Sequence, residues 1–141
     1  MSKEYERCSK VSYRQLFTIA ESAFRAKGCS TAMRREVLLA KCTMEGEELS
    51  FVLERDLEGN VRLSLLTDEP AEGKEELVVK YNFFLFGVKV MEDSEGYIAL
   101  ATELPESCLL NLGASQIFKE AEKLAAIYRN IKKSIHREKH S

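Results

Sequence analysis

Residues 77–104, LVVKYNFFLFGVKVMEDSEGYIALATEL, decide the fold of this 141-residue chain. Two apolar runs, 88–91 and 97–102, flank the acidic turn EDSEG at residues 92–96. Short apolar runs on either side of a turn that closes on glycine are typical of a β-hairpin. We therefore predict that the two runs pair antiparallel in a sheet and that Pro105 ends the second strand.

The segment before this hairpin, residues 75–86, is compatible with a helix or with a strand. Its valine and aromatic content suits a strand. Helical spacing (i, i+4, i+7, i+8) instead places four apolar side chains on one face: Leu77, Tyr81, Phe84 and Leu85. We predict a helix, because a lysine and two glutamates precede the apolar run and Gly87 can end it.

The N-terminal part of the chain predicts a helix followed by three strands. A capping box at residues 12–15 opens a helix over about 12–27, and Gly28 supplies a left-handed stop. Residues 28–36 are expected to form a polar link. Three runs with strand character, separated by Gly-bearing turns, then predict an antiparallel meander: 37–44, 48–55 and 60–67.

The C-terminal part predicts a long amphipathic helix that starts at an N-cap, Ser115, and runs to about residue 135. The fold class is therefore α+β, with helices packed on one face of an antiparallel sheet, in the order α-β-β-β-α-β-β-α. Three regions are expected: a flexible N-terminus (1–11), one α+β domain (12–135) and a basic tail (136–141).

Charge and hydropathy exclude several classes of protein. The net charge of −2 combines +5 in residues 1–44, −11 in residues 45–111 and +4 in residues 112–141. No single-sign field suited to nucleic acid is evident, so nucleic acid is not expected as a partner. No apolar run reaches the ~18 residues that cross a bilayer, so membrane insertion is not expected. The polar start lacks a secretory core, and we expect a cytoplasmic protein.

The cysteines do not have the spacing that is typical of metal-binding residues. None stands in a CxxC or CxxH pair, which speaks against zinc. In a reducing cytosol we expect free thiols, with Cys42 as a small apolar core residue. The four cysteines are Cys8, Cys29, Cys42 and Cys108.

No catalytic set is visible. Both histidines, His136 and His140, lie in the basic tail, where an imidazole has no fixed nucleophile to activate. Glycine-rich phosphate loops are absent, and the 92–96 turn lacks the alternating ligands of a calcium loop. We predict no catalytic residue, no metal and no cofactor.

Apolar side chains are in surplus at residues 83–86, where Phe83, Phe84, Leu85 and Phe86 are consecutive. Either this element is buried on both sides, or one side contacts another molecule, since interface cores are rich in aromatic residues. The terminal helix adds a second candidate surface, because its last apolar turns are expected to extend beyond the elements that the helix packs against. The predicted dimer or partner interface contains Tyr81, Phe83, Phe84, Phe86, Ile131 and Ile135.

The predicted order of elements resembles the type III secretion chaperone-like fold, which CesT-type chaperones and the YbjN family share. The similarity is clearest where an apolar segment with Asn82 leads into VKVMEDSEGYIALATELP (88–105) and a long helix follows. The resemblance implies a small α+β homodimer that binds extended segments of a client protein without catalysis.

We therefore predict a non-enzymatic, chaperone-like protein-binding module, with a second copy and an unidentified client protein as partners. One alternative is a small-ligand sensor or minor enzyme with a pocket between sheet and helices. The other is a nucleic-acid adaptor that uses the basic termini.

Overall fold

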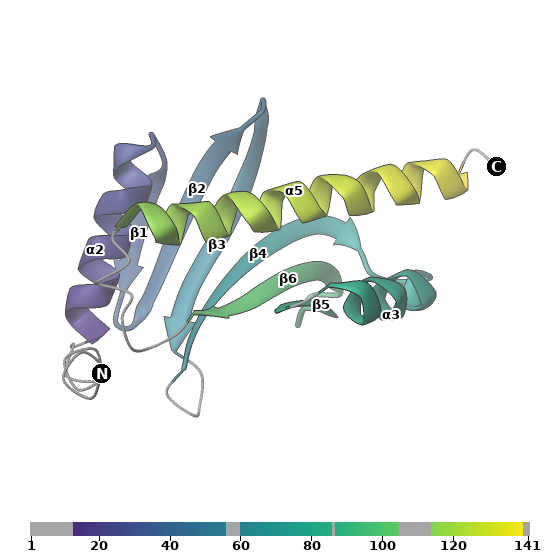
Figure 1. The fold of residues 1–141 in the computed structure, drawn as a ribbon, viewed down its shortest axis with the longest axis horizontal. Coiled ribbons are helices and arrows are strands. Elements are labelled where there is room, and N and C mark those ends of the chain that lie inside the picture. The colour runs from purple at the N-terminus through teal and green to yellow at the C-terminus, as the bar shows by residue number, and fades with distance from the viewer. Residues whose placement is uncertain (1–12, 56–59, 86, 105–113, 140–141) are drawn as a thin grey trace.

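The computed structural model describes residues 13–55, 60–85, 87–104 and 114–139. This part of the chain forms an α+β fold of three helices and a six-stranded sheet (Figure 1). The elements are α2 (Tyr13–Ala26), β1 (Ser30–Arg34), β2 (Val37–Met44), β3 (Glu47–Arg55), β4 (Val61–Pro70), α3 (Glu75–Phe84), β5 (Val88–Glu92), β6 (Tyr97–Leu104) and α5 (Ala114–Lys139). The predicted fold class is confirmed.

The sheet is antiparallel throughout, in the order β1-β2-β3-β4-β6-β5. Alternation along β2, β3 and β5 places buried apolar residues on one face of the sheet and exposed or half-buried residues on the other. One row of facing residues crosses five strands on the apolar face, and every member is at most 2% exposed: Ala40, Phe51, Leu65, Leu100 and Val90. A slip of one residue would turn this row to solvent, so the apolar pattern fixes the register.

Helices α2 and α5 cover the apolar face, and α5 crosses the strands (Figure 1). Phe24 of α2 joins the layers, since its ring lies 6.0 Å from Phe51 of β3 and 5.9 Å from Phe118 of α5. Further along α5, Leu124, Tyr128 and others continue the core. None of the described helices combines the length and apolar content needed to cross a membrane.

Helix α3 lies at the other end of the sheet, beside edge strand β5 and near the C-terminal half of α5 (Figure 1). Its helical conformation confirms the prediction for this segment, although it ends at Phe84 instead of residue 86. The helix ends there because Leu85 is extended and Gly87 has φ +77°, a conformation that glycine adopts without strain.

The prediction of a polar link at residues 28–36 is wrong, because β1 occupies most of it and pairs with β2. The pattern that identifies strands is weak here, since none of the residues of β1 is buried. Its hairpin turn also carries Arg35 (φ +54°) where glycine or asparagine is usual. Four strands, and not three, therefore precede α3.

The prediction of free thiols is wrong for Cys29 and Cys42, which form a disulfide. They are brought together by the β1–β2 hairpin, which the sequence did not reveal. Cys8 and Cys108 lie outside the described residues.

Two boundaries also differ. Helix α5 continues to Lys139, four residues beyond the predicted domain end at 135. Strand β4 continues to Pro70, three residues beyond the predicted end at 67, and Pro70 pairs with Tyr97 after an irregularity in the ladder.

Candidate functional site

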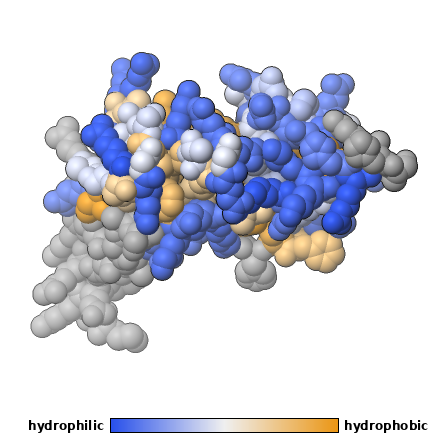
Figure 2. All heavy atoms as spheres, turned by 90° about the horizontal axis from the view of Figure 1, so that it is seen from above, coloured by the Kyte–Doolittle hydropathy of each residue, from blue (hydrophilic) through white to orange (hydrophobic). Residues whose placement is uncertain are grey.

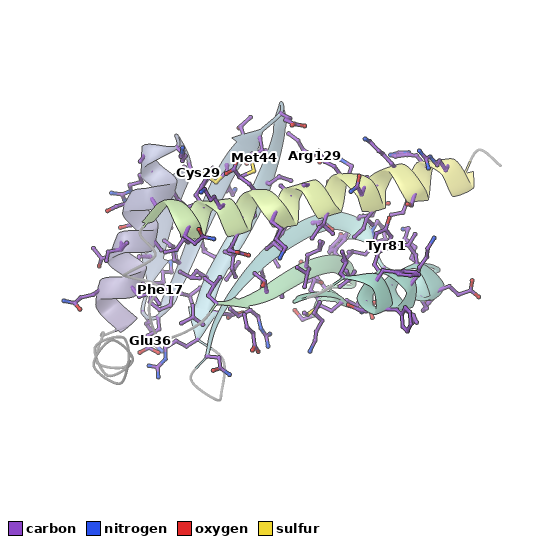
Figure 3. The ribbon with its side chains drawn as sticks, in the orientation of Figure 1. Phe17, Cys29, Glu36, Met44, Tyr81 and Arg129 are labelled. Carbon is purple, nitrogen blue, oxygen red and sulfur yellow. A yellow bond between two sulfur atoms is a disulfide. The ribbon has the colours of Figure 1, made fainter. Side chains whose placement is uncertain are left out.

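Helix α3 attaches to the domain through one face. Leu77 is buried, and Val78, Tyr81 and Leu85 pack against the core. The Tyr81 hydroxyl lies 2.8 Å from Ser134 Oγ of α5, and Figure 3 shows Tyr81 pointing from α3 toward that helix. These contacts fix the rotation of α3 about its own axis.

Asn82 fastens α3 to the edge of the sheet. Its side-chain amide donates to the Val90 carbonyl (2.7 Å), and its side-chain oxygen accepts from the Val90 N–H (2.6 Å). One side chain thus occupies both backbone groups that Val90, in the middle of β5, would offer to a further strand. This pair of hydrogen bonds protects the β5 edge from strand pairing with another chain.

The opposite face of α3 is apolar and uncovered. Val79, Phe83 and Phe84 are 68%, 82% and 71% exposed, and we call these three residues the α3 patch. The two rings lie 5.4 Å apart at 88°, in an edge-to-face contact with each other. Figure 2 shows light orange atoms projecting at this end of a mostly blue surface. Exposed aromatic pairs of this kind mark interaction sites.

Charged side chains surround the α3 patch. A shallow, open surface along α3 is lined by the patch together with Glu75, Glu76 and Lys80. The two glutamates occupy the first turn of α3, where the helix dipole favours negative charge. This surface of α3 therefore has an acidic end, an apolar centre and one flanking cation.

The structure distributes the predicted interface residues among three environments. Phe83 and Phe84 are exposed side by side, whereas Tyr81 faces α5 and is half-buried. Ile131 and Ile135 are 0% and 3% exposed in the core, so the expectation that they extend past the domain is wrong. That expectation left out α3, which lies beside this part of α5 and contacts it through Tyr81 and Ser134. Phe86 lies outside the described residues.

Sequence reasoning missed two residues of this site. Val79 lies one turn before Phe83, and that i, i+4 spacing was a usable signal. Asn82 entered only through the family resemblance, and its hydrogen bonds to Val90 could not be predicted because they depend on where β5 lies relative to α3.

A second surface, where β3 begins and β4 ends, is an acidic cleft of about 540 Å³. Tyr128 lines it, and burial raises the pKa of this tyrosine to about 12. The cleft has five carboxylates: Glu47, Glu48, Asp68, Asp93 and Glu95.

Two of these acids are engaged in the fold. Asp93 Oδ1 accepts from the backbone N–H groups of Glu95 (2.8 Å) and Tyr97 (3.0 Å), which shapes the hairpin turn. Glu47 pairs with Lys132 of α5 at 2.5 Å. Across the described ranges, no group of three His, Cys, Asp or Glu side chains is placed to hold a metal.

The uncovered face of the sheet carries scattered apolar residues, with Leu39 42% and Leu66 38% exposed. They lie among lysines, glutamates and small residues. Single exposed apolar residues are normal on protein surfaces. The α3 patch differs because its three side chains are contiguous and far more exposed.

Comparison of the chain with protein-family models, with curated proteins and with solved structures finds no match.

Proposed function

We propose that this chain is a protein-binding module that acts as a homodimer, and that the α3 patch is the surface through which two copies associate. The observation that carries the proposal is the exposure of Phe83 and Phe84 on a helix whose other face is fixed by Tyr81 and Asn82. Hydration of two exposed phenyl rings is unfavourable, so covering them with another apolar surface lowers the free energy.

The arrangement of charge favours a second copy of the same chain as the occupant. A two-fold axis makes an interface self-complementary, so each charged group must meet its opposite on the partner. Antiparallel packing of two α3 helices about Val79 brings Glu76 within about one helical turn of the partner's Lys80. The two Val79 side chains then meet on the axis, each Phe83 lies over the first turn of the partner helix, and the charges form two equivalent pairs.

The size of the α3 patch sets the expected strength. Stable interfaces bury about 800 Å² on each partner, which is more than three side chains provide. Association through α3 is therefore weak, with a dissociation constant on the order of micromolar unless neighbouring elements add contacts.

Dimer formation is the first half of the proposal, and client binding is the second. The α+β fold and the resemblance to the type III secretion chaperone-like fold support a dimer that holds a segment of a client protein in the cytoplasm. No enzymatic role is part of this proposal.

Light scattering on protein at tens of micromolar tests the dimer. We expect wild-type protein to have a mass above that of one 16.1 kDa chain, and Phe84→Glu to be a monomer with an unchanged far-UV circular dichroism spectrum. Leu39→Glu places the same charge at another exposed apolar site and should leave association intact. A wild-type monomer, or equal loss in both variants, would contradict the proposal.

A further inference from the structure

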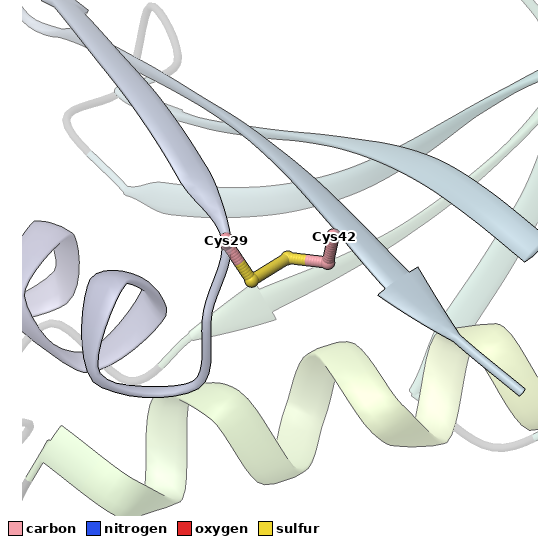
Figure 4. Close-up of a disulfide and its surroundings, with 2 residues drawn as sticks. All are labelled: Cys29 and Cys42. Atoms are coloured by element: carbon pink, nitrogen blue, oxygen red, sulfur yellow. A yellow bond between two sulfur atoms is a disulfide. The ribbon is translucent and has the colours of Figure 1, made fainter. Parts of the chain in front are cut away.

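The β1–β2 hairpin is joined covalently at both ends. Its turn connects Arg34 to Val37, and the Cys29–Cys42 disulfide joins the open end (Figure 4). Ser30 pairs with Lys41, so the two cysteines are the next facing pair. Their Cα atoms lie 4.4 Å apart, as in a pair that exchanges no backbone hydrogen bonds. The bond therefore locks β1 in its register.

Few other contacts hold β1. It is an edge strand with β2 as its single neighbouring strand, and none of its five residues is buried, although helix α2 lies against it and Met33 packs on the rim of the core. Thr31 Oγ1 accepts from Arg25 Nε (2.8 Å) and donates to Glu21 (3.1 Å), both in exposed or half-buried surroundings. Segments with few buried apolar contacts open locally far more often than core strands.

Strand β2 becomes an exposed edge when β1 opens. Its sequence, VLLAKCTM, is largely apolar. The two-residue turn after β2 makes Met44 and Glu47 a hydrogen-bonded pair, so alternate residues of β2 bond to β3 and the others, including Leu39, bond to β1. Without β1 these groups would be unpaired beside apolar side chains, and such an edge pairs readily with other chains.

We propose that the Cys29–Cys42 disulfide is a redox-controlled clasp that keeps β1 over the edge of β2. A thiol or dithiol reductant supplies two electrons and two protons. The S–S bond breaks, both cysteines become thiols, and the reductant becomes its own disulfide. The thiols remain small apolar side chains in a buried site, so the rest of the fold persists. Only the hold on β1 is lost.

Burial of the two cysteines couples reduction of the disulfide to opening of β1. Cys29 and Cys42 are 7% and 2% exposed, so a reductant reaches them only in molecules whose β1 has already opened. In the cytosol such bonds form and break with the redox state, whereas in an oxidising compartment the clasp stays closed. The inference is independent of the α3 patch.

The size of the effect follows from the loop that the bond closes. Cross-linking residues 13 apart restricts the open state by an entropy that makes opening about a hundredfold rarer. The oxidised and reduced proteins should therefore differ by about that factor in how often β1 is open.

Amide hydrogen exchange on the full chain tests the clasp, with oxidised protein compared before and after dithiothreitol. Reduction should speed exchange at Ala32 and Leu39, which pair across the hairpin, about a hundredfold. Amides of β4 and β6 should change by less than about threefold, because they belong to more stable strands. Cys29→Ala/Cys42→Ala should exchange like the reduced protein and ignore dithiothreitol, which controls for the other cysteines.

The wild-type comparison stands even if the double variant does not fold. Equal acceleration in all strands would overturn the proposal, since the bond would then only raise global stability. No acceleration in the hairpin would also overturn it. So would alkylation of Cys29 and Cys42 in protein that has been denatured without reductant.

Discussion

At the scale of single residues, Tyr128 and Asn82 show how one side chain joins distant parts of the fold. Tyr128 of α5 is 2% exposed beneath the acidic cleft, where its ring packs into the hydrophobic core. Asn82 lies on the surface of α3 and completes the hydrogen bonding of Val90. One residue contributes mainly through burial, the other through two directed bonds, and each contribution has its own experimental signature.

Tyr128 predicts a loss of stability at alkaline pH. Burial raises its pKa from 10.0 to about 12, with nearby carboxylates adding to the rise and a hydrogen bond with Thr67 opposing it, so the unfolded chain releases this proton first as pH rises. The free energy of unfolding should be unaffected below pH 10 and fall by about 1.4 kcal/mol per unit between pH 10 and 12. Urea denaturation of wild type and Tyr128→Phe across this range isolates the contribution. Parallel curves for the two proteins would show that the phenol ionises freely in the fold.

Asn82 predicts a stability cost that depends on geometry. Asn82→Ala leaves two backbone groups of Val90 without their partner and should lower the free energy of unfolding by about 1–2 kcal/mol. Asn82→Asp keeps the acceptor for the N–H but sets a carboxylate against the Val90 carbonyl, so it should not restore stability. Denaturation in urea and exchange of the Val90 amide measure both effects. An Asn82→Asp variant as stable as wild type would contradict the pair of hydrogen bonds between Asn82 and Val90.

At the scale of elements, α3 combines an anchored face and an exposed face within ten residues. The same helix closes the β5 edge and presents the α3 patch, so the chain has placed its exposed apolar side chains on a helix rather than on a strand edge. A helix satisfies its own backbone groups, and only its side chains are available to a partner.

The two-fold packing of α3 predicts a charge-swap result. Glu76→Lys and Lys80→Glu should each weaken dimer formation, because like charges then face each other at the rim. The double variant Glu76→Lys/Lys80→Glu restores opposite charges across the axis and should recover most of the association. Sedimentation velocity at several protein concentrations measures all four proteins. Failure of the double variant to recover, with its helix content intact, would rule out this packing.

The sequence revealed most elements because alternation and glycine turns are local signals. It missed β1, whose residues STAMR carry no apolar alternation and whose turn uses Arg35 at positive φ. The missed strand also hid the disulfide, since only the β1–β2 register brings Cys29 opposite Cys42. The site was half predictable: the surplus of phenylalanine was visible, but which side of α3 faces out depends on Tyr81 reaching α5.

At the scale of the whole molecule, the uneven charge of the sequence is partly neutralised inside one chain. Arg129 and Lys132 of the basic α5 pair with Glu45 and Glu47 at the acidic β2–β3 turn. These pairs engage two of the cations that a nucleic-acid adaptor would need. The acidic first turn of α3, by contrast, borders the α3 patch, where a second copy can complement it.

Photo-crosslinking from the α3 patch tests the central claim most directly. With Val79 replaced by a photoreactive phenylalanine analogue, irradiation at tens of micromolar should give a product of twice the 16.1 kDa chain mass. Mass spectrometry should place both halves of the link in peptides that contain α3. A link from α3 to the uncovered face of the sheet, or no product of double mass, would contradict the account.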